Sequence, residues 1–126
     1  MSLKTICIKG DATDYDMEND SFFAYSSKMK YKASIDLDGI ILDIAEDDSI
    51  MGVEILDISS RLGVSRYDVR NYKSLDMVVD ISENVIEVEI TFSILKRNAP
   101  TPHVVEASAL NSMHLPVGSG SLAVVA

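Results

Sequence analysis

Two acidic stretches hold the side chains most suited to chemistry in this 126-residue chain. The first lies between Asp11 and Asp20 and carries carboxylates at alternate positions, a supply of oxygen ligands that could bind Ca²⁺ or Mg²⁺. It is not an EF-hand, because counting from Asp14 places an asparagine at position six and a tyrosine at position twelve. The alternative is a solvated turn whose carboxylates accept local backbone hydrogen bonds. The candidate cation ligands are Asp14, Asp16, Glu18 and Asp20.

The second stretch places two carboxylates, Glu54 and Asp57, in the apolar segment Ile50–Ile58. A carboxylate buried by a strand must be paired or protonated, and its pKa rises if it has no partner. Glu54 could act as a general acid or base with Asp57 or Asp43. The favoured interpretation is structural: hydrogen bonds to Glu54 fix the helix that follows. The sequence has no G-x-S-x-G or Cys/His arrangement to supply a nucleophile, so we predict a non-catalytic protein.

Charge and composition exclude several other functions. With 20 acidic and 11 basic residues the net charge is −9, and phosphate backbones and anionic membranes repel such a protein. The single cysteine, Cys7, excludes an intramolecular disulfide and a zinc site made of cysteines. The chain lacks a secretory signal pattern and a transmembrane stretch, which favours the cytoplasm. No cofactor is predicted apart from a divalent cation.

The elements that position these residues are mostly β-strands. Alternating apolar and polar residues predict an antiparallel hairpin over 75–94, and Asp38-Gly39 predicts a tight turn between two further strands. Between residues 59 and 72 the period changes: Gly63 is placed to end one short helix and Ser65 to begin another. The sequence therefore predicts an α+β fold, a mostly antiparallel β-meander of about six strands with two short helices.

The C-terminal segment differs in composition from the rest of the chain. It holds all three prolines, and Glu106 is its one charged residue after Arg97. We predict a single α+β domain over residues 1–97 and an ordered extension over 98–126 that packs on its own or a neighbouring subunit. The end of the extension is expected to add a strand to a sheet edge. Its candidate interface residues are Leu122, Val124 and Val125.

Two motifs resemble a known family. The run Tyr15-Asp-Met-Glu-Asn-Asp-Ser-Phe-Phe23 resembles a Y-D-x-x-x-D-x-[LF]-[YF] opening, and Gly52–Ser59 resembles a G-I-E-I-L-D-A-S signature, in small prokaryotic proteins grouped as domain-of-unknown-function 2283. The resemblance covers residues 15–95, with departures at Phe23, Val53 and Ile58. It implies a small α+β fold with a β-meander and no assigned activity; some members are suspected of pairing with small toxin-like proteins.

The distribution of charge along the chain determines how we rank the functional hypotheses. Eight acidic residues and no basic one lie between Ala33 and Ser60. The leading hypothesis is a non-catalytic binding or assembly protein, in its simplest form a homodimer, whose acidic surface suits a basic protein partner. A Ca²⁺- or Mg²⁺-binding protein is the alternative.

A nucleic-acid binder ranks third, because Ile58–Asn71 is close to a helix-turn-helix pattern in which Arg66, Arg70 and Asn71 could meet phosphates or bases. The net negative charge opposes it, and so does the preceding strand, which leaves no room for a supporting helix.

Overall fold

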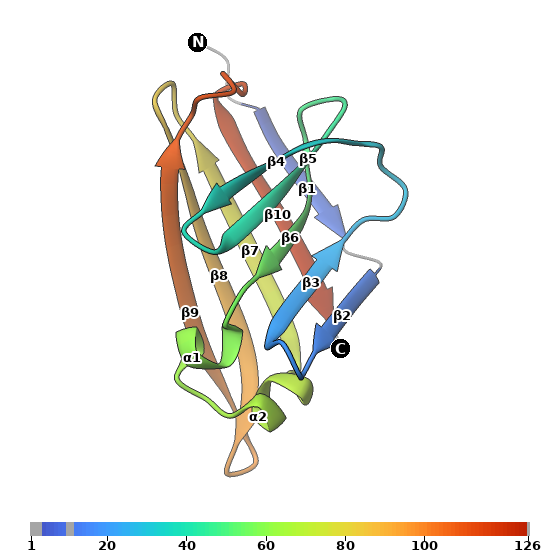
Figure 1. The fold of residues 1–126 in the computed structure, drawn as a ribbon, viewed down its shortest axis with the longest axis vertical. Coiled ribbons are helices and arrows are strands. Elements are labelled where there is room, and N and C mark those ends of the chain that lie inside the picture. Colours follow the sequence, from blue (N-terminus) through green and yellow to red (C-terminus); the bar gives the residue numbers. More distant parts are fainter. Residues whose placement is uncertain (1–3, 10–11, 126) are drawn as a thin grey trace.

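The chain folds into two five-stranded sheets that face each other around one core, with two short helices at one end (Figure 1). The structure is a computed structural model and describes residues 4–9 and 12–125. Sheet A has the order β1-β10-β7-β8-β9, and its strands are β1 (Lys4–Lys9), β7 (Ser74–Ile81), β8 (Val85–Lys96), β9 (Ala99–Leu110) and β10 (Gly118–Val125). Sheet B has the order β2-β3-β6-β5-β4, and its strands are β2 (Ala12–Asp16), β3 (Ser21–Tyr25), β4 (Tyr31–Leu37), β5 (Ile40–Ala45) and β6 (Ile50–Ile55). The helices α1 (Ile58–Leu62) and α2 (Arg66–Arg70) connect β6 to β7.

The mostly antiparallel arrangement and the two short helices are confirmed, whereas six strands in one meander is wrong. Ten strands lie in the described residues, and only β1 and β10 pair in parallel. The sequence did not predict β2, which is rich in aspartate, or β9, which contains Pro100 and Pro102. Both lie at sheet edges, where a strand has one unpaired side and tolerates residues that a central strand excludes.

The segment 98–126 is part of sheet A. Arg97 and Asn98 both have positive φ and form the tight turn between β8 and β9, so strand pairing continues across the predicted boundary at residue 97. The expected edge strand near the C-terminus is instead an interior strand, because β10 lies between β1 and β7. Leu122 and Val124 are buried in the core of their own chain, and only Val125 is exposed.

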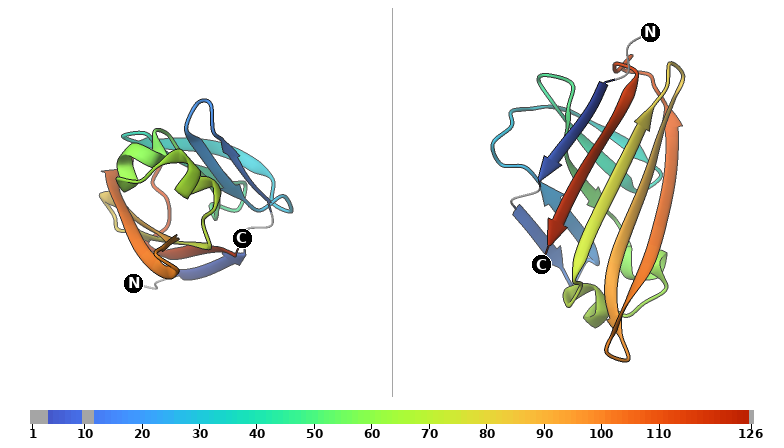
Figure 2. Two further views of the ribbon diagram at one scale, coloured as in Figure 1. Left: turned by 90° about the horizontal axis from the view of Figure 1, so that it is seen from below. Right: turned by 180° about the vertical axis from the view of Figure 1, so that it is seen from behind.

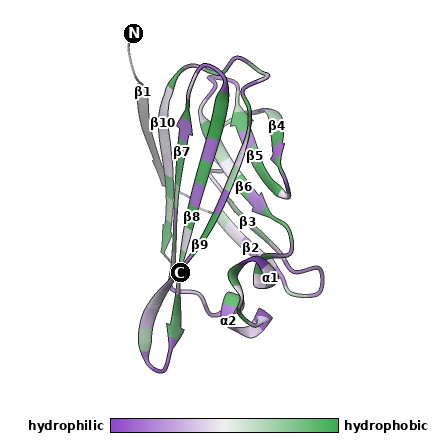
Figure 3. Cartoon of the chain, turned by 90° about the vertical axis from the view of Figure 1, so that its left-hand side faces the viewer, coloured by the Kyte–Doolittle hydropathy of each residue, from purple (hydrophilic) through white to green (hydrophobic). Residues whose placement is uncertain are grey.

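The core fills the space between the two sheets. Phe22 of β3, Phe92 of β8 and Tyr72 meet edge to face, with ring centroids 5.1 to 5.9 Å apart. Apolar residues alternate with polar ones along β7 and β8, which gives these strands one buried and one wet face (Figure 3). The aromatic cluster thus joins one sheet to the other.

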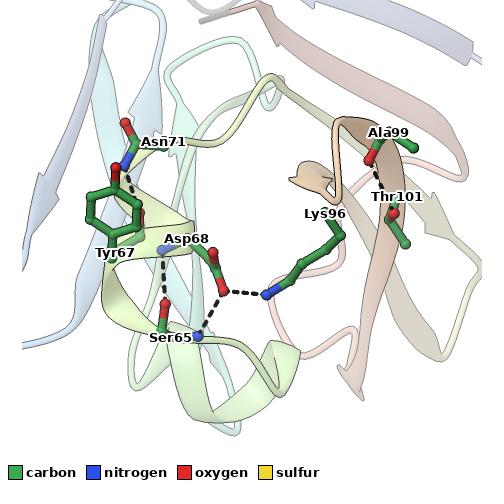
Figure 4. A network of polar contacts seen from close by, with 7 residues as sticks. All are labelled: Ser65, Tyr67, Asp68, Asn71, Lys96, Ala99 and Thr101. Atoms are coloured by element: carbon green, nitrogen blue, oxygen red, sulfur yellow. Dashed lines mark hydrogen bonds and ion pairs between the residues drawn. The ribbon is translucent and has the colours of Figure 1, made fainter.

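The helices end and begin where the sequence predicts. Gly63 closes α1 with a φ of 69°, and Ser65 forms a capping box with Asp68 at the start of α2. Lys96, at the end of β8, pairs with the same Asp68 carboxylate and holds its pKa below the usual range (Figure 4). This ion pair ties α2 to the β8–β9 hairpin. Neither helix is long and apolar enough to cross a membrane, and no other helix occurs in the described residues.

Candidate functional site

The two sequence motifs meet at the carboxylate of Asp20. Tyr15 donates its hydroxyl to Asp20 Oδ1 at 2.7 Å, and Ser59 donates its hydroxyl to Asp20 Oδ2 at 2.7 Å. The backbone N–H of Ser59 lies 3.2 Å from both carboxylate oxygens. Asp20 is 2% exposed and has a φ of 57°. The carboxylate therefore fixes the β2–β3 turn against the first turn of α1.

The environment of Asp20 keeps the carboxylate ionised. Burial acts to raise its pKa, but the hydrogen bonds from Tyr15 and Ser59 outweigh burial and lower it. Burial, and then the bond to Asp20, raises the pKa of the Tyr15 phenol. Arg66 also lowers the pKa of Asp20, while its guanidinium donates to the carbonyl oxygens of Met17 and Glu18 at 2.8 Å. These contacts hold the β2–β3 turn against the two helices.

The four predicted cation ligands are not brought together. Asp16 accepts hydrogen bonds from the backbone N–H groups of Glu18 and Asn19 at 3.1 Å, and from the Asn19 side chain at 2.7 Å. Asp14 and Glu18 are exposed, whereas Asp20 is buried against Ser59. Within residues 12–125, no three His, Cys, Asp or Glu side chains form a group able to hold a metal ion. The stretch is the strand β2 followed by a locally hydrogen-bonded turn, and only the turn matches the alternative considered from the sequence.

The predicted buried carboxylates lie in different surroundings from those expected. Asp57 is exposed, because it enters α1 with a φ of 52° and its side chain makes no capping hydrogen bond. Glu54 is half-buried on the outer face of sheet B, where burial and then the charge of Asp43 raise its pKa. The role of fixing the next helix, expected of Glu54, belongs to Asp20.

Glu54 yields a prediction about pH. An acid whose folded-state pKa is raised stabilises the fold below its unfolded pKa, about 4.3, and this stabilisation is lost as pH rises through the folded pKa. We expect Glu54→Gln to raise the melting temperature relative to the natural chain at pH 7 and to leave it unchanged at pH 4. Differential scanning calorimetry across this range checks it, with Glu83→Gln in the β7–β8 turn as control; an equal shift at both pH values would contradict it.

The residues of the helix-turn-helix pattern serve the fold. Arg66 is committed to the carbonyl groups of the β2–β3 turn, and Asn71 donates its side-chain amide to the carbonyl oxygen of Tyr67 at 2.9 Å. Each helix spans five residues. All three candidate contact residues are exposed, and Arg70 lies in the last turn of α2.

A second candidate site, absent from the sequence predictions, lies on the outer face of sheet A. The strand register sets Asp80 opposite Glu87, and Glu89 opposite Glu106. Side chains directly opposite on neighbouring strands have Cβ atoms about 5 Å apart, so each pair brings like charges together. The four carboxylates line a hollow of about 410 Å³, on the face turned toward the viewer in the right panel of Figure 2.

The acidic hollow holds carboxylates without a cation from the described part of the chain. Among the described residues, two ion pairs are formed, Lys32 with Asp48 and Lys96 with Asp68. Neither ion pair includes a carboxylate of the hollow. A neighbouring hollow of about 370 Å³ shares Asp80 and Glu87 and continues to the start of β10. The only sequence signal was the polar half of the alternating hairpin, which is typical of any wet sheet face.

Comparison with known proteins identifies the family. Residues 12–59 match the family described as a protein of unknown function, DUF2283. A Methanosarcina mazei protein named a putative hypoxanthine phosphoribosyltransferase is 48% identical over 106 residues, 84% of this chain and 86% of that protein. An uncharacterized protein of Methanocaldococcus jannaschii is 32% identical over 106 residues, 83% of this chain and 91% of its own length. No solved structure matches.

The chain belongs to the DUF2283 family. The match ends at residue 59, whereas the resemblance was expected to extend to residue 95. The matched residues 12–59 comprise sheet B and the start of α1, so they include Asp20 and its hydrogen-bond donors Tyr15 and Ser59. The acidic hollow lies beyond them, on β7, β8 and β9.

Proposed function

We propose that this chain is a non-catalytic binding protein that docks a basic protein segment in the acidic hollow on the outer face of sheet A. The observation that carries the proposal is the pairing of Asp80 with Glu87 and of Glu89 with Glu106 across neighbouring strands. Like charges directly opposite one another destabilise a sheet. A partner that brings lysine or arginine side chains into the hollow relieves this repulsion, and electrostatic complementarity supplies specificity and a fast association rate.

The outer face of sheet B is also acidic, but two of its carboxylates accept hydrogen bonds within the chain. Asp36 accepts the backbone N–H of Gly39 at 2.8 Å, and Asp43 accepts the hydroxyl of Ser34 at 2.8 Å. Glu54 is half-buried, and burial and the nearby charge of Asp43 raise its pKa. Sheet A therefore offers the stronger surface for a cationic partner.

The name of the Methanosarcina mazei relative suggests a second function, transfer of a phosphoribosyl group. The phosphoribosyl donor and the products of such a reaction carry phosphate, and the hollow presents four carboxylates, which repel phosphate. The two helices have five residues each, too short to offer the N-terminal anion site of a long helix. The geometry supports cation recognition over phosphate recognition.

The proposal predicts a site-specific loss of affinity for a basic probe. Decalysine, a peptide of lysines only, is titrated against the full chain by fluorescence anisotropy at low ionic strength. We expect the double variant Glu87→Lys, Glu89→Lys to bind at least about tenfold more weakly than the natural chain, because it reverses two of the four charges in the hollow.

The matched control reverses two exposed charges away from the hollow, on Asp14 of β2 and on Glu46 between β5 and β6, as Asp14→Lys and Glu46→Lys. Both double variants change the net charge equally, so the control should lose affinity by a much smaller factor. Equal losses in the two variants would mean that decalysine senses net charge only, and would contradict a binding site on sheet A.

A further inference from the structure

The strand β9 forms an open edge of sheet A. It is twelve residues long and pairs only with β8 among the described strands. Figure 3 views the molecule from the side on which β9 lies in Figure 1. An unpaired edge is a template for another strand, and proteins usually protect it with charged residues or proline. Here Pro100 and Pro102 protect one end, and Glu106 is the only charged residue of the strand.

The prolines indicate which backbone groups face the open side. Proline has no N–H, and in an edge strand it occupies positions whose N–H would point away from the sheet. Backbone groups two residues apart point the same way in a strand, and the register of β9 with β8 has no shift. The N–H and C=O groups of Val104, Glu106 and Ser108 therefore face the open edge.

The side chains of the same residues lie on the outer face of sheet A. Val104 is 51% exposed and Leu110 is 74% exposed, the two large apolar side chains that β9 leaves open to water. They stand six residues apart, with Glu106 and Ser108 between them. Such an edge is apolar at both ends and polar in the middle.

We propose that two copies of this chain pair antiparallel through β9, with the two-fold axis at Ala107. In β9 the even-numbered residues direct their N–H and C=O groups to the open edge. Hydrogen bonds between the two copies therefore require even-numbered residues to lie opposite even-numbered residues. An axis at Ala107 meets this condition and sets Val104 opposite the partner's Leu110, and Glu106 opposite the partner's Ser108. An axis at Glu106 would meet it too, but would oppose two identical charges. The axis at Ala107 covers the exposed apolar residues and avoids that clash.

The pairing goes beyond the proposed function, because it places the acidic hollows of two chains next to each other. Two five-stranded sheets become one continuous sheet, and the acidic hollows, each of which reaches Glu106 and Ser108, adjoin across the axis. Two acidic surfaces brought together repel each other, and salt screens that repulsion. The dimer should therefore strengthen, rather than weaken, as ionic strength rises.

Sedimentation equilibrium of the full chain over a micromolar concentration series tests the pairing. We expect a dimer in the natural chain, and at least about a tenfold rise in its dissociation constant for Ser108→Pro, which removes one open N–H as Pro100 and Pro102 already do. Leu110→Asp, at a site that the fold leaves exposed, should weaken it similarly. Val125→Lys changes an equally exposed apolar residue on β10 and should leave it unchanged.

Two results would overturn the pairing: a monomer at every concentration and salt level, or a dimer that Ser108→Pro and Leu110→Asp leave intact. Melting temperatures of the variants show whether each is folded, and Leu110→Asp decides the outcome if Ser108→Pro is not. A monomeric chain that still binds decalysine in its hollow would overturn the pairing and leave the proposed function standing.

Discussion

Replacing Asp20 with alanine is expected to lower the free energy of unfolding by about 4 kcal/mol. The substitution removes the acceptor for the Tyr15 hydroxyl, the Ser59 hydroxyl and the Ser59 N–H. A buried donor that loses its partner costs about 1–3 kcal/mol, and alanine at a positive φ adds about 1 kcal/mol or more. Urea denaturation of both chains measures the difference, which would be a large share of the stability of a domain this size.

Asp20→Asn is the matched control for backbone conformation, because asparagine tolerates positive φ and keeps one acceptor. We expect it to lose about 2 kcal/mol at neutral pH. A loss below about 0.5 kcal/mol in the alanine variant would show that the contacts of Asp20 do not hold α1 in place.

The pH dependence of this loss follows from the lowered pKa of Asp20. A carboxylate with a depressed folded-state pKa stabilises the fold above its unfolded pKa, about 3.9, and the stabilisation is lost as pH falls through the folded value. The difference between the natural chain and Asp20→Asn should therefore shrink as pH falls below about 4.

The second large effect is expected for Phe92→Ala, which should lower the free energy of unfolding by about 3–5 kcal/mol. Phe92 is fully buried and contacts Phe22 of the facing sheet at a centroid distance of 5.1 Å. Truncation leaves a cavity between the sheets and removes two edge-to-face contacts, the second with Tyr72. Phe92→Leu, which fills more of the space, should cost about 1–2 kcal/mol.

Hydrogen exchange in the Phe92→Ala chain shows whether the sheets form one cooperative unit. If they do, amide protection falls in both sheets together, because each buries its apolar face against the other. Loss of protection in sheet A alone would mean that sheet B is stable by itself, and would contradict a shared core.

The sequence predicted the local structure well wherever one signal acts over a few residues. Gly63 and Ser65 marked the helix limits, and strict alternation marked β7 and β8. It failed at β2 and β9, whose composition is unlike that of typical strands. Their sheet positions come from long-range pairing, which tolerates aspartate and proline at an edge.

The two candidate sites, like the strands, depend on contacts between residues far apart in the sequence. The carboxylate of Asp20 stands in a motif that suggests a cation ligand, and only the fold reveals Ser59 as its partner, 39 residues away. The acidic hollow is less visible still, because Glu106 joins Glu89 only through the register of β9. A wet sheet face and a binding face have the same alternating pattern, and the difference lies in which charges become neighbours.

The most direct test of the proposed binding surface is an NMR titration of the isotope-labelled full chain with decalysine at low ionic strength. We predict that amide shifts concentrate in β7, β8 and β9 around Asp80, Glu87, Glu89 and Glu106, while the outer face of sheet B, with its own carboxylates Asp14, Asp36 and Asp43, moves little. Shifts spread evenly over both faces, or centred on sheet B, would contradict a binding site in the acidic hollow.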